Sequence, residues 1–463
     1  MAHQPHTRSR GEAQGPALKG GGDTIAAVAT PPGRGGIGIV RVSGPAARAI
    51  AHGVVGKVPE PRVATHAPFR AADGAPVDEG VALFFAAPRS YTGEDVLELQ
   101  GHGGPVVMRE LLRRCLELGA RMAEPGEFTR RAFLNERLDL AQAESVADVI
   151  DAASVEAARG AVRSLCGEFS RRVHALVDSL VELRVHVEAC IDFPEEEIDP
   201  ADRRWQRERL SSLRGDLAAL LEDARQGAVL REGLTVVLAG RPNVGKSSLL
   251  NRLAGEDVAI VTPVAGTTRD YVRATISLEG VPIHLVDTAG LRPAGDEVER
   301  IGIERTWRAI ENEAGAALFV EDAQGASVED EGLRARLPER LPRARVVNKI
   351  DLTGEAPGRS DAGPEPVLRV SARTGAGLEA LRAWLLDLAG WRPHGEGLFI
   401  ARERHLVALR EAQDALDRGS GTQAFELQAE DLRITQAALG RITGEVSPDQ
   451  LLGEIFSRFC IGK

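Results

Sequence analysis

A Gly-rich segment in the middle of the chain carries residue types that bind phosphate. Residues 240–247 read Gly-Arg-Pro-Asn-Val-Gly-Lys-Ser and fit the pattern G-x4-G-K-[ST], between an expected strand and an expected helix. In this setting backbone N–H groups bind phosphate oxygens and a lysine adds a point charge, while a hydroxyl can coordinate Mg²⁺. We therefore predict that a nucleotide is bound by Asn243, Val244, Gly245, Lys246, Ser247 and Ser248, with Ser247 on Mg²⁺.

Three further motifs each follow an expected strand, and they indicate which base is bound. They are Asp287-Thr288-Ala289-Gly290, Asn348-Lys349-Ile350-Asp351 and Ser371-Ala372-Arg373. The Asp351 carboxylate can accept hydrogen bonds from N1–H and the 2-amino group of guanine, which adenine does not offer. The carboxyl ends of strands in an open α/β sheet are where ligands bind. Together the four motifs predict a site for GTP rather than ATP.

The segment between the first two motifs has the polar, Gly-containing character of a loop that orders around the γ-phosphate. Within residues 262–270, Thr268 is best placed to complete the Mg²⁺ shell. Leu291 stands where many GTPases place a glutamine that orients water. The Asn243 amide oxygen can hold a monovalent cation such as K⁺ beside the phosphates. Residues that could orient water instead are Glu297, Glu299 and Glu304, and the spacing does not choose among them.

Composition places these motifs in a multidomain globular chain. The 463 residues predict roughly three domains, and 43% hydrophobic residues are enough to bury several cores. A net charge of −11 argues against nucleic-acid binding through overall charge. The four cysteines form no CxxC pair, which suits a reducing cytosol, and no apolar run approaches a membrane span. We expect a cytoplasmic protein without a membrane anchor.

The elements that must position these residues change character along the chain. Residues 1–22 read as a disordered extension, and residues 23–136 as a mixed domain of short strands. From Val162 to Cys190 apolar residues alternate at steps of 4 and 3, which predicts one long helix packed on another. Alternating strands and helices at 231–390 predict a doubly wound parallel sheet. This α/β domain interrupts a helical region at 137–230 and 391–463.

A family resemblance spans about residues 23–463. The motifs that carry it are Thr30-Pro-Pro-Gly-Arg-Gly-Gly36, the stretch from Tyr91 to Gly104, Pro125-Gly-Glu-Phe-Thr129, Leu138-Asp-Leu-Ala-Gln-Ala-Glu144, Ile191-Asp-Phe193 and the terminal Phe459-Cys-Ile-Gly-Lys463. In this order they resemble the tRNA modification GTPase family MnmE, also called TrmE. The Cys-Ile-Gly-Lys terminus after an inserted G domain is highly specific to that family.

The resemblance implies a fold and an activity. It implies an N-terminal α+β domain that binds folate and dimerises, a discontinuous helical domain and an inserted Ras-like P-loop GTPase domain. Family members are K⁺-activated GTPases. With the flavoprotein MnmG, in a heterotetramer, they add a carboxymethylaminomethyl group to C5 of the tRNA wobble uridine. The one-carbon donor is a tetrahydrofolate derivative in its 5,10-methylene or 5-formyl form. The tRNA is contacted directly or through the partner.

The resemblance also transfers roles to particular positions. The K⁺ ligands fall on Asn243, Thr262, Val264 and Thr267, the water-orienting residue on Glu299, and the Mg²⁺ ligands on Ser247 and Thr268. The folate site falls on Arg41, Glu98, Arg137 and Lys463, where Arg137 replaces the lysine that is common in the family. Cys460 falls on a cysteine tied to modification activity. A different class of function, a regulatory or ribosome-assembly GTPase without modification chemistry, stays open.

Overall fold

The computed structural model divides the chain into two compact units. It describes residues 22–192, 199–241, 243–254, 274–287, 314–325, 338–339, 341–392, 397–422, 424–445, 449–457 and 459–462. Unit 1 is Met1–Ala143 with Ser447–Lys463, and unit 2 is Glu144–Val446. The division falls inside helix α4 (Leu140–Asp151). The two ends of the chain therefore contribute to the same unit.

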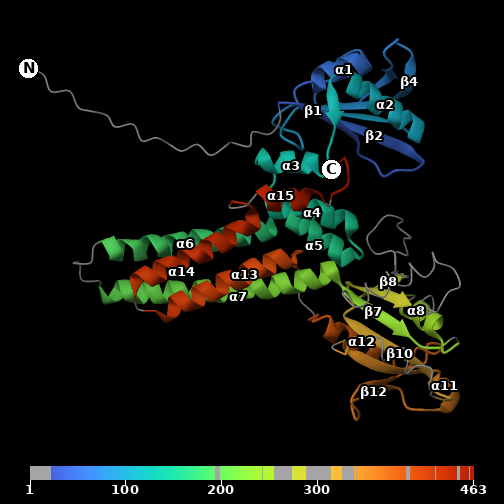
Figure 1. Cartoon of the computed structure of the whole chain (residues 1–463), viewed down its shortest axis with the longest axis vertical. Coiled ribbons are helices and arrows are strands. Elements are labelled where there is room, and N and C mark those ends of the chain that lie inside the picture. The colour runs from blue at the N-terminus through green and yellow to red at the C-terminus, as the bar shows by residue number, and fades with distance from the viewer. Residues whose placement is uncertain are drawn as a thin grey trace, which may run out of the picture. The chain divides into compact units, whose positions relative to one another are not determined.

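Unit 1 is built on a six-stranded sheet in the order β3-β4-β5-β2-β1-β6 (Figure 1). Its neighbours pair antiparallel except β1 with β6. The strands are β1 (Thr24–Val28), β2 (Gly35–Ser43), β3 (Thr65–Arg70), β4 (Pro76–Phe85), β5 (Val96–Gly103) and β6 (Ala120–Met122). Apolar and polar residues alternate along β2, so Val40 and Val42 face the core while Arg41 faces away from it.

Two helices share a buried core with this sheet. They are α1 (Ala47–Val55), which ends at Gly56 in the left-handed conformation, and α2 (Pro105–Glu117), which begins with a proline in its first turn. Ile50 and Leu111 from these helices are fully buried with Phe69 and Phe84 from the sheet. Unit 1 also contains α3 (Glu127–Leu134) and, from the far end of the chain, α15 (Asp449–Ser457). The ring of Phe456 lies 6.4 Å from that of Phe133.

Unit 2 contains long helices, and one sequence prediction about them is wrong. The seam from Val162 to Cys190 does not form one helix, because the chain breaks at Cys166 and at Gly167, whose φ is +82°. Helix α5 (Val155–Leu165) ends there and α6 (Glu168–Asp192) begins. The seam residues on α6 from Phe169 to Val187 are buried as expected, whereas Val162 and Cys166 are exposed. The prediction failed because the apolar spacing continues through a turn that Gly167 makes possible.

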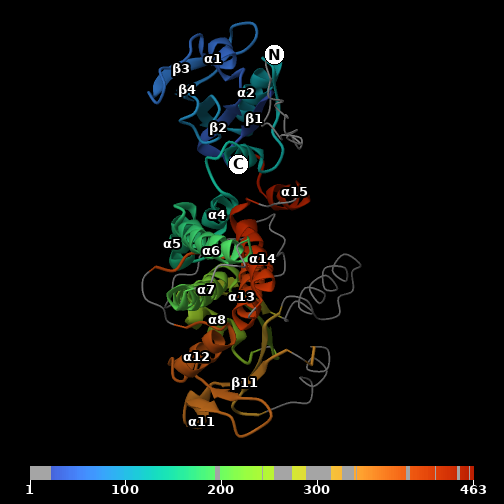
Figure 2. The same cartoon turned by 90° about the vertical axis from the view of Figure 1, so that its left-hand side faces the viewer.

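Three more long helices form a bundle with α6, in which α6 packs on the first and third of them and the second packs on the other two (Figure 2). They are α7 (Pro200–Glu232), α13 (Glu403–Gly421) and α14 (Phe425–Thr443). The Asp199 carboxylate accepts a hydrogen bond from the Ala201 N–H and caps α7. Helix α7 ends at Glu232 and is followed after Gly233 by the first strand of the α/β sheet.

A seven-stranded sheet in the order β12-β13-β11-β10-β7-β9-β8 carries the phosphate-binding motif. Its strands are β7 (Leu234–Ala239), β8 (Ala274–Leu278), β9 (Val281–Asp287), β10 (Ala316–Asp322), β11 (Arg343–Asn348), β12 (Gly358–Ser360) and β13 (Val367–Arg369). The five central strands are parallel, which confirms the parallel sheet predicted from the sequence. The edge strands β8 and β12 pair antiparallel and were not predicted.

Short connections and helices complete this part of unit 2. They are α8 (Lys246–Ala254), α11 (Ile350–Thr353) and α12 (Leu378–Leu388). Leu249, Leu318, Val346 and Leu381 are buried in a common core between the sheet and these helices. Among the helices that the structure describes, none is both long and apolar enough to cross a membrane.

Candidate functional site

The phosphate loop is shaped by glycines at positions where a side chain does not fit. Gly240 has φ +144°, and a Cβ there would lie 2.3 Å from the Val320 carbonyl oxygen. Gly245 has φ +95°, and its Cβ would lie 2.3 Å from Asn348 Nδ2. Asn243 also adopts a left-handed conformation, with φ +67°. These conformations turn the chain from β7 into α8, as a loop that wraps phosphate requires.

Lys246 lies inside this loop and contacts its backbone. It is buried at the start of α8, and its Nζ donates to the carbonyl oxygens of Gly240 at 2.6 Å and Arg241 at 2.9 Å. Ser247 and Ser248 are exposed in the first turn of the helix. The lysine therefore lies at the N-terminus of α8, and both the ammonium and the helix N-terminus stabilise negative charge.

Asn348 joins three of the predicted motifs. It is almost fully buried at the end of β11. Its Nδ2 donates to the Val244 carbonyl oxygen at 2.9 Å, and its Oδ1 accepts from the Ala372 N–H at 3.0 Å. One side chain thus holds the phosphate loop, the Asn-Lys-Ile-Asp segment and the Ser-Ala-Arg segment in register. Because each amide group is satisfied, the arrangement is rigid before any ligand arrives.

Asp351 and Lys349 lie next to this junction. Asp351 Oδ1 accepts a hydrogen bond from Ser371 Oγ at 2.6 Å, and Arg373 approaches Oδ2 at 3.7 Å. Lys349 has φ +66° and pairs through Nζ with Asp322 at 2.7 Å. An aspartate oriented in this way at a sheet's carboxyl edge can accept two hydrogen bonds from a guanine edge. The sequence missed the Asp322 contact, since no motif marks that residue.

Several predicted site residues lie outside the described residues. They are Thr262, Val264, Thr267, Thr268, Thr288, Ala289, Gly290, Glu299 and Lys463. Asp287 ends β9, where its backbone is paired with Leu238 of β7. In the part of the chain that the structure describes, no three His, Cys, Asp or Glu side chains form a cluster that could hold a metal ion. The Mg²⁺ and K⁺ assignments stay predictions.

A second group of predicted residues meets in unit 1. Arg41 of β2 and Glu98 of β5 are directly opposite in the antiparallel register, and Arg41 Nε lies 2.9 Å from Glu98 Oε1. The Arg41 guanidinium carbon lies 5.6 Å from the centre of the Tyr91 ring and 5.7 Å from that of Phe128. Burial raises the pKa of Tyr91, whose hydroxyl is hydrogen-bonded to Thr129 at 2.8 Å. Cation, carboxylate and two aromatic rings therefore face one another.

The C-terminal segment reaches the same place. Arg41 Nη1 donates to the Gly462 carbonyl oxygen at 3.3 Å, and Gly126 N–H donates to the Cys460 carbonyl oxygen at 3.4 Å. Gly462 has φ +99°, and a Cβ on it would lie 2.4 Å from the Val28 carbonyl oxygen. The Cys460 side chain is exposed. Arg41, Glu98 and the backbone at Gly462 are brought together, although they are distant in sequence.

Arg137 is not drawn into this cluster. It is exposed, and its Cγ would lie 3.3 Å from a Cβ built on Gly93. Among the described residues, Arg137 makes neither a hydrogen bond nor an ion pair with Arg41 or Glu98. Tyr91 and Phe128 of this cluster were not predicted as site residues, although both lie within the family motifs at residues 91–104 and 125–129.

Comparison with known proteins assigns the parts of the chain that carry the two sites to one family. Residues 24–137 match the model of the "GTP-binding protein TrmE N-terminus" family, and residues 140–460 match that of the "MnmE helical domain" family. A "tRNA modification GTPase MnmE" from Azoarcus sp. (strain BH72) is 60% identical over 95% of this chain and 98% of its own length. This chain belongs to the MnmE family.

Further relatives of the MnmE family cover the chain to the same extent. The "tRNA modification GTPase MnmE" from Ralstonia nicotianae (strain ATCC BAA-1114 / GMI1000) is 59% identical over 95% of this chain and 96% of its own length. Among solved structures, the G domain of the T. maritima FeoB iron transporter is 24% identical over 34% of this chain and 98% of that chain, with a TM-score of 0.26. The MnmE resemblance stated from the sequence motifs is confirmed.

Proposed function

We propose that this chain uses GTP hydrolysis, activated by K⁺, to drive modification of C5 of the tRNA wobble uridine. As a member of the MnmE family the chain is a GTP hydrolase that acts in tRNA modification. The proposal adds three points. The group attached to the uridine is carboxymethylaminomethyl, the partner is the flavoprotein MnmG, and the one-carbon donor is a tetrahydrofolate derivative. The observation that carries it is the pair of preorganised sites, one at Asn348 in unit 2 and one at Arg41 in unit 1.

The contacts of Lys246 suggest how GTP is taken up. Its ammonium is held by two loop carbonyls, and a phosphate oxygen offers a charged acceptor in their place. The loop N–H groups bind the remaining oxygens. In this proposal Ser247 and Thr268 hold Mg²⁺, which bridges phosphate oxygens and neutralises developing charge. Asp351 accepts hydrogen bonds from guanine, and Asp287 to Gly290 follow the γ-phosphate.

The K⁺ site in this proposal uses Asn243 with Thr262, Val264 and Thr267. Asn243 is exposed at the turn of the phosphate loop, in a left-handed conformation that asparagine tolerates better than most side chains. A cation held beside the phosphates supplies the charge that an arginine finger supplies in other GTPases. Glu299 takes the role of orienting water, because Leu291 has no hydrogen-bonding group.

The folate site in this proposal is the cluster around Arg41. A carboxylate such as Glu98 suits the N–H edge of a pterin, and the Tyr91 and Phe128 rings suit its flat face. Arg137 and Lys463 supply cations for the folate carboxylates. Cys460, whose backbone is bound to Gly126, acts in the modification chemistry. We further propose a cytoplasmic homodimer that joins MnmG in a heterotetramer and meets tRNA directly or through that partner.

Nucleoside analysis of tRNA tests the proposal. In a strain that lacks this chain, we expect the wobble-uridine modification to disappear and the chain carried on a plasmid to restore it. A chain with Glu98→Gln should fail to restore it while still hydrolysing GTP, because the substitution affects unit 1 only. Intact modification in the deletion strain would refute the proposal and favour a regulatory or ribosome-assembly GTPase.

The cation dependence of GTP hydrolysis tests the K⁺ site separately. We expect hydrolysis to be far faster in K⁺ than in Na⁺, since Na⁺ is too small for a cage of backbone and amide oxygens. The Asn243→Ala variant should lose this difference and keep GDP binding. Equal rates of the unsubstituted chain in the two salts would remove Asn243 from the mechanism.

A further inference from the structure

The side chain of Lys349 is held at its tip by an acidic residue from the neighbouring strand. Asp322 ends β10, and Asn348 ends β11 directly beside it in the parallel register. Lys349 Nζ lies 2.7 Å from Asp322 Oδ2. The pair is partly exposed, with 33% of the lysine side chain and 26% of the aspartate side chain open to solvent. The two residues meet at the sheet edge that carries the guanine motif.

The Asp322 carboxylate is itself fixed by a tight turn. Its other oxygen, Oδ1, accepts from the Gln324 N–H at 3.1 Å, and the Asp322 carbonyl oxygen accepts from the Gly325 N–H at 3.1 Å. The Ala323 N–H donates to the Asn348 carbonyl oxygen at 2.9 Å, which binds the turn to β11. The hydrogen bond from Lys349 lowers the pKa of Asp322. Lys349 is therefore held by a rigid, charged acceptor.

The stem of Lys349 passes the phosphate loop. Its backbone is left-handed, with φ +66°, and its Cε lies 4.0 Å from the position of a Cβ on Gly245. A lysine side chain that is free to rotate loses rotamer entropy when it is ordered. Because Asp322 holds the tip, the stem is already ordered between the phosphate loop and the guanine motif before a nucleotide binds.

We infer that Asp322 is a positioning residue for guanine nucleotides, which orders the Lys349 stem as an apolar wall of the pocket. It touches neither the base nor the phosphates and acts through Lys349. The lysine side chain then loses its conformational entropy when the chain folds and not when the nucleotide binds, so the nucleotide is bound more tightly. The inference concerns the nucleotide site alone and does not depend on folate or K⁺ chemistry.

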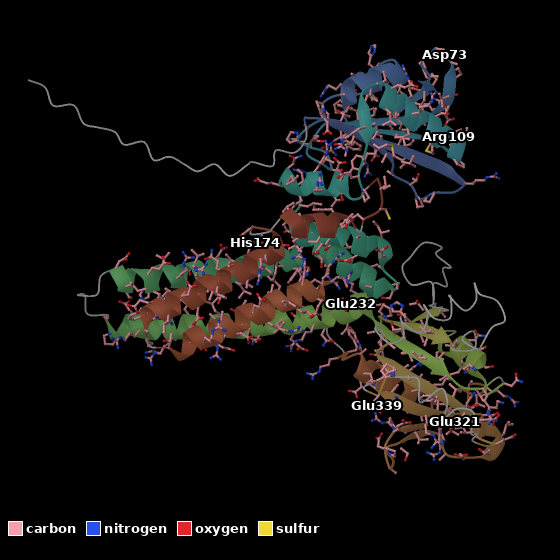
Figure 3. All side chains as sticks on the ribbon, viewed as in Figure 1. Asp73, Arg109, His174, Glu232, Glu321 and Glu339 are labelled. Atoms are coloured by element: carbon pink, nitrogen blue, oxygen red, sulfur yellow. The ribbon has the colours of Figure 1, made fainter. Side chains whose placement is uncertain are left out.

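The dissociation constant of the fluorescent analogue mant-GDP tests this inference. In the Asp322→Asn variant we expect it to rise about two- to fivefold, the range of a partly exposed charged contact. The matched control is Glu321→Gln on the same strand (Figure 3), which removes a partly buried ion pair of 2.7 Å with Arg345. That variant should bind mant-GDP as the unsubstituted chain does. An unchanged constant in Asp322→Asn, or an equal rise in Glu321→Gln, would overturn the inference.

A double-substitution cycle separates positioning from a general loss of structure. If Asp322 acts through Lys349, adding Asp322→Asn to a Lys349→Ala chain should cause no further loss of mant-GDP binding. The thermal midpoint without nucleotide should also be the same for Asp322→Asn and Glu321→Gln within error. A full additional loss in the Lys349→Ala background would show that Asp322 acts by another route and would refute the inference.

Discussion

Glu144 is a buried acid whose charge is fully compensated by neighbours in unit 2. Its two oxygens accept from Arg404 Nε at 2.8 Å and Nη2 at 2.6 Å, and His405 Nε2 lies 3.0 Å away. Burial alone raises the pKa of Glu144, but the hydrogen bonds from His405 and Arg404 outweigh it and hold the pKa well below its ordinary value. A buried carboxylate without these partners would be strongly destabilising.

His405 is neutral in this arrangement, as its two ring nitrogens indicate. Nδ1 lies 3.1 Å from the Arg402 backbone N–H, which can only donate, so Nδ1 accepts. The proton therefore sits on Nε2 and is donated to Glu144. Burial, together with the charge of Arg404, lowers the pKa of His405 to about 4.

Acid sensitivity follows from these two residues. Between pH 6.5 and pH 4 the unfolded chain binds a proton on His405 that the folded chain excludes, so stability falls as pH is lowered through this window. The loss is about 3 kcal/mol for the full shift. His405→Gln should flatten this dependence in urea unfolding followed by circular dichroism. Glu144, whose folded pKa is lowered, starts to lose its contribution only as pH falls below about 4.5, its ordinary pKa.

The matched control for His405 is His174 on α6, a half-exposed histidine of the same unit (Figure 3). His174→Gln should leave the pH dependence of unfolding unchanged. If His405→Gln and the unsubstituted chain lose stability equally between the two pH values, the buried histidine is not its source. Glu144→Gln should cost about 3–5 kcal/mol at neutral pH, since it leaves buried arginine charge unpaired.

Some residues of the two sites were predictable from the sequence, whereas the contacts between them were not. The phosphate and guanine motifs were recognisable because their backbone conformations demand particular residues, as at Gly240 and Gly245. Arg41 and Glu98 were assigned to one folate site through the family resemblance, without any prediction that they pair with each other. Their pairing depends on a strand register between β2 and β5, and register is set by tertiary packing rather than by either segment alone.

At the scale of elements, the start of α3 packs directly against the C-terminal segment. Gly126 caps α3 with φ +66°, and a Cβ there would lie 2.6 Å from the Phe456 carbonyl oxygen and 2.9 Å from Phe459 Cβ. Pro125 and Ile461 form an antiparallel bridge beside it. The backbone at Cys460 therefore depends on a glycine more than three hundred residues away in sequence.

Gly126→Ala should release the C-terminal segment. The alanine pays about 1–2 kcal/mol for the left-handed conformation and also meets Phe456 and Phe459. Amide hydrogen exchange of peptides covering residues 456–462 should become faster. Gly119→Ala is the control, because Gly119 has φ +103° with no atom near its Cβ position. Equal exchange in the two variants would show that backbone strain, not the clash, decides the outcome.

The β8–β9 hairpin shows why the strand β8 was not predicted from the sequence, whereas β9 was. It contacts two helices that precede the sheet in sequence. Ser154 Oγ, at the N-cap of α5, donates to the Gly280 carbonyl oxygen at 2.6 Å, and His284 Nε2 lies 3.2 Å from the carbonyl oxygen of Glu232, the last residue of α7. Figure 3 marks Glu232 at the end of α7. The five residues of β8 are an edge strand that these contacts stabilise, so their short pattern carried little signal.

At the scale of the whole molecule, the C-terminal residues belong to the unit that begins the chain. Residues 447–463 are grouped with 1–143, while the nucleotide site lies wholly in unit 2. Phe456 and Phe459, with ring centres 5.7 Å apart, supply apolar packing to unit 1. The C-terminal segment should therefore matter for the stability of unit 1 and not for binding of nucleotide.

A chain that stops after Val446 tests this division. We expect it to bind mant-GDP with unchanged affinity, whereas hydrogen exchange in β1, β2 and α3 becomes faster. The reason is that truncation removes the Gly462 carbonyl that Arg41 contacts and the rings that pack at Gly126 and Phe133. Weakened nucleotide binding together with unchanged exchange in unit 1 would contradict the division.

The sequence by itself determined the nucleotide chemistry, the alternation of parallel strands and helices, and the family. These follow from local requirements: glycines where φ is positive, a lysine and hydroxyl after them, and apolar runs of strand length. Only the tertiary structure decided the break between α5 and α6, the Asp322–Lys349 contact and the docking of Cys460 beside Gly126. The two contacts depend on packing between segments that are distant in sequence, which no local pattern encodes, and the break is a turn at Gly167 that the apolar spacing does not mark.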